Sequence, residues 1–142
     1  MRPMVKIPES ARALLESGRL AHLVTTNPDG SPQISIVWAG LEDNEIVVGH
    51  LGSGQKIRNI ERDPRVALSF EGTEVQPPGL HQYLVVYGTA RITEGGAPQL
   101  LQDLAHVYLG PDVKFPPFDD PPPGKVVHIA VERIAGVGPW TS

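Results

Sequence analysis

Turn signals at close spacing are the feature that most constrains what this chain can fold into. Asn-Pro-Asp-Gly at 27–30 has turn-forming chemistry at every position, and Glu-Asp-Asn at 42–44 makes a second turn. Strand-like runs surround these turns at Leu20–Thr26, Gln33–Trp38 and Ile46–Leu51. Short runs joined by turns predict an antiparallel β-meander over the first half of the chain.

The rest of the chain also holds more strands than helices. Further strands are predicted at Val66–Phe70, His81–Thr93 and Val126–Ile134. Helices are predicted at Pro8–Gly18, Gln55–Arg62 and Ala97–Leu109. The fold class is therefore mainly β (α+β), with a six-stranded antiparallel sheet. Closure of that sheet into a barrel would leave no bare edges.

One domain is expected over residues 1–142, because no repeat or shift in composition marks a boundary. The six prolines at 110–124 predict an exposed loop, and residues 135–142 form a tail. Pocket walls are expected from this loop and from a second loop at 73–80.

Charge and composition exclude several classes of protein. The net charge of −4 argues against a general nucleic-acid or anionic membrane surface. No run approaches the ~18 apolar residues that span a bilayer, so a cytoplasmic location is expected. The absence of cysteine excludes disulfides and thiolate metal sites. The five histidines are not spaced as metal ligands, and no metal site is expected.

The most informative local motif is the junction before the second predicted helix. Gly52, Ser53 and Gly54 precede Gln55, and such a junction aims unpaired backbone N–H groups outward as an anion site. Lys56 lies in the first turn, where the positive end of the helix dipole disfavours a cation. A bound phosphate would explain why a lysine occupies this position. Asn59 follows on the same side. The alternative is an ordinary helix start with solvated basic side chains.

A second candidate is the polar face of the 33–38 strand. Gln33 and Ser35 alternate with Ile34 and Ile36. When one face of a strand carries isoleucines, the polar side chains on the other face ordinarily point to solvent, unless a ligand or partner covers them.

No catalytic side chain is predicted. The sequence has no Gly-x-Ser-x-Gly elbow, no Walker loop and no acid–base pair of carboxylates. If the protein is an enzyme, a cofactor must supply the chemistry.

Five short motifs follow one another along the chain: Leu-Val-Thr-Thr at 23–26, Asp-Gly-Ser-Pro-Gln at 29–33, Lys-Ile-Arg-Asn-Ile at 56–60, Asp-Pro-Arg-Val-Ala-Leu at 63–68 and Tyr-Gly-Thr-Ala at 87–90. In this order they resemble the pyridoxamine 5'-phosphate oxidase-like split-barrel superfamily, and within it the branch that uses the deazaflavin coenzyme F-420.

The resemblance implies a homodimer with cofactor sites at the interface. Lys56 matches the lysine that contacts the cofactor phosphate. Ser53, Gly54, Gln55 and Asn59 match the rim of that pocket. The ring system would lie along Gln33 and Ser35, and Tyr83 matches an aromatic contributed by the second subunit. The ending Gly-Pro-Trp at 138–140 resembles tails that fold over the site, although Trp140 could equally be a packing residue.

One departure from the family pattern favours the deazaflavin. True pyridoxamine phosphate oxidases grip the flavin phosphate with an arginine and a lysine, at positions that here read Ser35 and Gly40. The resemblance therefore implies an F-420-dependent reductase that passes a hydride to a small electrophile such as an enone, quinone or nitroaromatic. The alternatives are an FMN-dependent reductase or oxidase, and a non-catalytic carrier of flavin, haem or another tetrapyrrole that would need His22, His50 or His81 exposed at its pocket.

Overall fold

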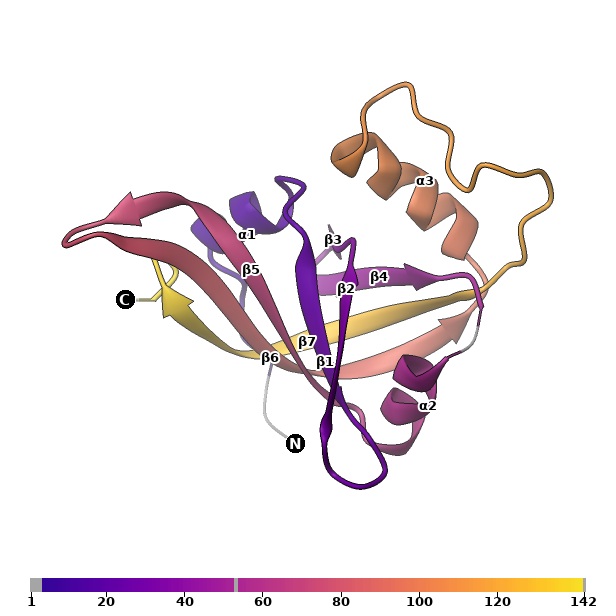
Figure 1. Ribbon diagram of the computed structural model, residues 1–142, viewed down its shortest axis with the longest axis horizontal. Coiled ribbons are helices and arrows are strands. Elements are labelled where there is room, and N and C mark those ends of the chain that lie inside the picture. The colour runs from indigo at the N-terminus through magenta and orange to yellow at the C-terminus, as the bar shows by residue number, and fades with distance from the viewer. Residues whose placement is uncertain (1–3, 53, 142) are drawn as a thin grey trace.

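The computed structural model describes residues 4–52 and 54–141, which form one antiparallel sheet with helices at its ends (Figure 1). The strands of the described chain are β1 (Ala21–Thr26), β2 (Pro32–Val37), β3 (Gly40–Glu42), β4 (Glu45–His50), β5 (Arg65–Gln76), β6 (Leu80–Glu94) and β7 (Lys125–Val137). The helices are α1 (Glu9–Leu15), α2 (Gln55–Arg62) and α3 (Ala97–Tyr108).

The strand order leaves the sheet split. It runs β2-β1-β5-β6-β7-β4-β3, so β2 and β3 have no hydrogen-bonded neighbour on their outer sides among the described strands. The long hairpin of β5 and β6 curves across the molecule, and β7 returns along β6 from Glu94 to Tyr83. Helices α2 and α3 lie at the same end of the sheet, on opposite sides of β4 (Figure 1).

The core fills the inner face of this sheet. Leu23, Leu68 and Val86 lie opposite one another on β1, β5 and β6, and each is at most 1% exposed. Alternation with period two places every second side chain of these strands inside. The described helices include none that is long and apolar enough to cross a membrane.

The sequence prediction of a mainly β fold is confirmed, but its strand count of six is wrong. The described chain has seven strands, because Gly40–Glu42 pairs with β4 across the predicted turn. β5 is also longer than predicted and continues to Gln76. Residues 73–80, expected as a loop, instead form the end of β5, a short turn at 77–79 and the start of β6.

The predicted faces of β2 are reversed in the structure. Ile34 and Ile36 are 61% and 60% exposed, whereas Gln33 and Ser35 are half-buried on the inner face. The register explains this result, because Ser35 lies opposite the fully buried Leu23. Alternation in a sequence defines two faces of a strand, but not which of them meets the core.

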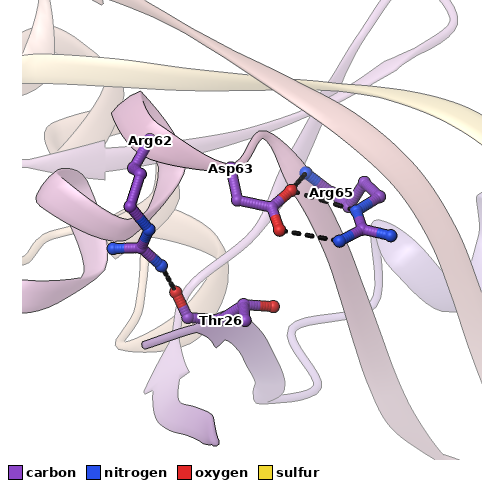
Figure 2. A network of polar contacts seen from close by, with 4 residues as sticks. All are labelled: Thr26, Arg62, Asp63 and Arg65. Carbon is purple, nitrogen blue, oxygen red and sulfur yellow. Dashed lines mark hydrogen bonds and ion pairs between the residues drawn. The ribbon is translucent and has the colours of Figure 1, made fainter. Parts of the chain in front are cut away.

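Helix α2 ends in a polar turn that fixes its exit into β5 (Figure 2). The Asp63 carboxylate accepts hydrogen bonds from the backbone N–H and the guanidinium of Arg65, at 2.8 to 3.2 Å. Arg62 donates to the carbonyl oxygen of Thr26 on β1. The hydrogen bonds from Arg65 lower the pKa of Asp63 from 3.8 to about 2.

We expect this turn to make a small, acid-sensitive contribution to stability. Because the folded-state pKa of Asp63 is the lower one, its contribution is complete above about pH 4 and is lost as the pH falls toward 2. Arg65 is exposed, so screening by solvent keeps the effect small. Unfolding free energies of wild type and Asp63→Asn should therefore differ at pH 7 and converge near pH 2. An equal difference at both values would contradict this account.

Candidate functional site

A pocket of about 310 Å³ lies where the ends of β2 and β4 meet α2, α3 and the proline-rich loop. Neither β2 nor β4 hydrogen-bonds to the other, so the opening follows from the split in the sheet. The pocket takes its lining from Ile36, Val37, Trp38, Gly49, His50, Leu51, Lys56, Leu101 and Phe115.

Lys56 supplies the positive charge of this pocket. Its side chain is half-buried and forms no ion pair or hydrogen bond with the residues that the structure describes. Burial accordingly lowers the pKa of the ammonium group below its ordinary value. The N-cap of α2 is Gly54, which has no side chain to cap the helix, and the first turn holds no acidic residue. A half-buried cation beside open backbone N–H groups favours binding of an anion such as a phosphate.

An aromatic wall lies across the same pocket. The rings of Trp38 and Tyr108 stack at 5.5 Å, and Phe115 meets Trp38 edge-on at 5.0 Å. The Tyr108 hydroxyl accepts from the Ala39 N–H at 3.0 Å and donates to the Arg19 carbonyl at 2.8 Å. These bonds tie α3 to the segment after β2, so Trp38 stands against a fixed neighbour. Stacked and edge-on rings of this kind suit a flat, conjugated ligand.

Ser35 adds an unsatisfied polar atom next to the pocket. Its hydroxyl oxygen is buried and has no hydrogen-bond partner among the described residues. Ser35 shares the inner face of β2 with Val37, which lines the pocket. Buried hydroxyl groups are ordinarily hydrogen-bonded, so a ligand atom on this side of β2 would satisfy it.

The remaining predicted residues of this region form a polar network behind Lys56. Asn59 is fully buried and donates to the Thr25 hydroxyl at 3.0 Å and to the Asn27 side chain at 2.9 Å. Its amide oxygen accepts from Gln55 at 2.7 Å. Thr25 in turn donates to Gln33 at 2.8 Å. The structure thus brings Gln33, Gln55 and Asn59 together, and their contacts join α2 to β1 and β2.

Two further positions, Ser53 and Tyr83, were predicted. Ser53 lies outside the described residues. Tyr83 lies on β6, is 44% exposed, and lines a separate cavity of about 590 Å³ together with His22 and His81. Within one chain the structure does not place Tyr83 in the lining of the Lys56 pocket.

The C-terminal Trp140 is a packing residue in the described chain. It is 8% exposed, belongs to the main hydrophobic core, and donates its indole N–H to the Tyr83 carbonyl at 3.1 Å. It is not among the residues that line the Lys56 pocket.

Sequence reasoning missed most of the apolar lining. Trp38 and Leu101 were not predicted as site residues, and His50 was predicted only for the alternative of a non-catalytic carrier. The 110–124 loop was expected to supply a wall and contributes Phe115. The available signal was the tryptophan at the end of a predicted strand, two residues before Gly40. Aromatic residues at strand ends commonly belong to the core, so this signal did not indicate a site. Contacts between Trp38 and Phe115, 77 positions apart in the sequence, depend on tertiary packing.

Comparisons with known proteins agree with this architecture. An F-420 reductase structure is 28% identical, covers 91% of this chain and 98% of its own, and superposes with a TM-score of 0.73. A conserved hypothetical protein from Mycobacterium tuberculosis is 24% identical, with coverages of 94% and 85% and a TM-score of 0.71. A haem-binding protein from Mycobacterium smegmatis is 21% identical and covers 100% of this chain and 57% of its own, with a TM-score of 0.67. These last two likenesses concern the fold alone.

A search of curated proteins gave no match. The sequence profile described as pyridoxamine 5'-phosphate oxidase matches residues 7–138, which is most of the chain. The split antiparallel sheet, with its pocket between the open ends of β2 and β4, accords with that match. The chain therefore belongs to the pyridoxamine 5'-phosphate oxidase family of split barrels.

Proposed function

We propose that this protein is a cytoplasmic, homodimeric F-420-dependent reductase of small electrophilic molecules. The observation that carries the proposal is Lys56, a half-buried cation without a described partner, at the open end of α2 in an aromatic-walled pocket. The likeness to an F-420 reductase over nearly the whole length of both chains supports it.

In this proposal, Lys56 and the N–H groups at Gly54 and Gln55 bind the cofactor phosphate, with Ser53 at the rim. Ser35 offers its hydroxyl to the ring system. A reduced deazaflavin would supply a hydride to an electrophilic carbon of an enone, quinone or nitroaromatic, and water would supply the balancing proton. The chain contributes binding, orientation and exclusion of water, without an obligatory general acid.

The pocket volume supports a site completed by a second subunit. At about 310 Å³ it lies at the lower end of the ~300–1,000 Å³ typical of ligand sites, which is small for a whole dinucleotide-sized cofactor. We therefore assign the partner's Tyr83 to the far side of the cofactor.

The outward face of the sheet is our proposed dimer surface. Val24 lies opposite both Ile34 and Ala67, and Ala67 lies opposite Tyr87. Side chains that are directly opposite in antiparallel strands share a face, so these four form one outward row across four strands. Ile34 and Tyr87 remain 61% and 37% exposed in the single chain. This apolar row ends at β2, an edge strand without an outer neighbour among the described strands. Both features favour burial of the row against a second copy of the chain.

The variant Ile34→Asp/Ile36→Asp should be a monomer. Each isoleucine that loses burial removes ~1.5–3 kcal/mol of apolar stabilisation, and each new carboxylate would be desolvated in the interface. The dimer dissociation constant, measured by sedimentation equilibrium, should rise by at least about 100-fold. Leu109→Asp, at an equally exposed leucine after α3, is the matched control and should remain dimeric. A monomeric wild type would refute the proposed interface.

Parallel fluorescence titrations with F-420 and FMN test the cofactor. Saturable binding of F-420 alone would support the reductase and justify a substrate screen with enones, quinones and nitroaromatics. Binding of FMN alone would replace it with an FMN-dependent reductase or oxidase. Binding of neither would overturn both proposals.

The non-catalytic carrier is the second candidate, and the 590 Å³ cavity is the observation that favours it. Both His22 and His81 line this cavity, and a neutral imidazole is a common ligand of haem iron. Addition of haemin would then give a Soret shift that His81→Ala or His22→Ala abolishes. An unshifted spectrum with wild type would exclude this function.

A further inference from the structure

Two hydrogen bonds from one side chain, that of Gln102, connect the proline-rich loop to helix α3. Gln102 of α3 donates from its amide nitrogen to the Val113 carbonyl at 2.8 Å. Its amide oxygen accepts from the Phe115 N–H at 3.0 Å. Within the described chain, the other hydrogen bond from residues 111–122 to a residue outside them is the local turn bond from the Val113 N–H to the Gly110 carbonyl at 3.4 Å.

This double hydrogen bond determines where the Phe115 ring stands. The two bonded backbone groups, the Val113 carbonyl and the Phe115 N–H, lie on either side of Lys114, much as a neighbouring strand would bond them. The Phe115 ring meets Trp38 at 5.0 Å, and both rings line the Lys56 pocket. The Gln102 amide nitrogen also lies 2.9 Å from the His106 ring one turn away, which fixes the rotamer of Gln102 on the helix.

We propose that Gln102 is the positioning residue of this pocket. It holds Phe115 against Trp38 and so forms the wall on which the flat ring of the ligand lies, while Lys56 binds the phosphate. This inference rests on the proposed function for the identity of the ligand. The geometry of the wall does not depend on it.

The physical basis is the cost of ordering the loop. A long segment without secondary structure has many conformations, and ligand affinity falls when ligand binding itself must order it. With Gln102 in place, the wall is ordered before the ligand arrives. Without it, Phe115 is free to leave Trp38, and the ring of the ligand loses one of its contact surfaces.

The first test needs no ligand. Trypsin can cut after Lys114, which lies within the held segment and is exposed. Gln102→Ala should speed this cut at least several-fold and, in a Trp140→Phe background where Trp38 is the sole tryptophan, should red-shift the emission. Gln99→Ala is the matched control, because in the part of the chain that the structure describes this side chain bonds only to the exposed Asp103 on the same helix. Gln102→Glu retains the acceptor for the Phe115 N–H but loses the donor to the Val113 carbonyl. Its cleavage rate and its Trp38 emission should lie between those of wild type and Gln102→Ala.

The second test separates ring from phosphate. Gln102→Ala should weaken the binding of both F-420 and the corresponding deazaflavin without its phosphate by the same factor, roughly 5- to 10-fold. Lys56→Met should weaken F-420 only. Equal affinities in Gln102→Ala and Gln99→Ala would overturn the positioning role.

The two proposals fail in different ways. If wild type binds neither deazaflavin, the proposed function fails, and the proteolysis and emission of Gln102→Ala still decide whether this side chain sets the wall. If wild type binds F-420 but Gln102→Ala leaves loop cleavage and Trp38 emission unchanged, the function stands and the Gln102 assignment is wrong.

Discussion

Replacing Lys56 by methionine should weaken the binding of F-420 by roughly 10- to 100-fold, the range expected for loss of a charge-assisted hydrogen bond to a phosphate. Methionine retains most of the apolar stem, so the change isolates the charge. Lys56→Ala should have at least the same effect. Because burial lowers the pKa of the Lys56 ammonium, that charge costs stability in the empty protein. The ligand-free Lys56→Met variant should therefore be as stable as wild type or slightly more stable.

Arg58 provides the matched control for this prediction. It lies two residues further along α2 and is exposed, and among the described residues its side chain bonds only to the Gln55 side chain, at 3.1 Å. If the general positive field of the helix attracts the cofactor, Arg58→Ala and Lys56→Met should weaken binding equally. If the half-buried ammonium binds the phosphate directly, Arg58→Ala should have little effect. Unchanged affinity in both Lys56 variants would remove Lys56 from the site.

Local chemistry in the sequence was sufficient to predict α2 and its cation. The bounds Gln55–Arg62 follow from Gly54 before the helix and from Asp63-Pro64 after it, since a residue before proline leaves the helical region. Lys56 was recognisable because its position in the first turn is unfavourable without an anion. Signals of this kind depend on a few neighbouring residues, and the tertiary structure does not alter them.

The features that sequence could not supply all depend on distant partners. The outward direction of Ile34 follows from the pairing of β2 with β1, and alternation in β2 alone is symmetrical. Likewise, the stacking of Trp38 on Tyr108 joins residues 70 positions apart. The wall of the pocket therefore became visible only with the tertiary contacts, whereas its charged end was visible in one short motif.

Asn59 is a third case, because the sequence singled it out but its contacts depend on the tertiary structure. Sequence similarity predicted it as a cofactor-binding residue. In the structure it is fully buried, with four hydrogen bonds to Thr25, Asn27, Gln55 and Arg62 at 2.7 to 3.3 Å. Every polar atom of its side chain already has partners in the described protein. We therefore propose that Asn59 serves the cofactor by holding α2, and with it Lys56, on β1.

Asn59→Ala should accordingly lower the free energy of unfolding by roughly 3–4 kcal/mol, because it leaves several buried polar groups unsatisfied at once. For a chain of this size that corresponds to a fall in Tm of roughly 10 °C, measurable by calorimetry. Thr25→Val is the discriminating partner, since Thr25 lies behind Asn59 on β1 and is 1% exposed. If Asn59 acts by holding α2 on β1, both variants should weaken F-420 binding. A double-mutant cycle on the free energy of F-420 binding should then show a coupling of about 1 kcal/mol between the two positions. If Asn59 instead contacts the cofactor itself, only Asn59→Ala should weaken binding, while Thr25→Val should affect stability alone.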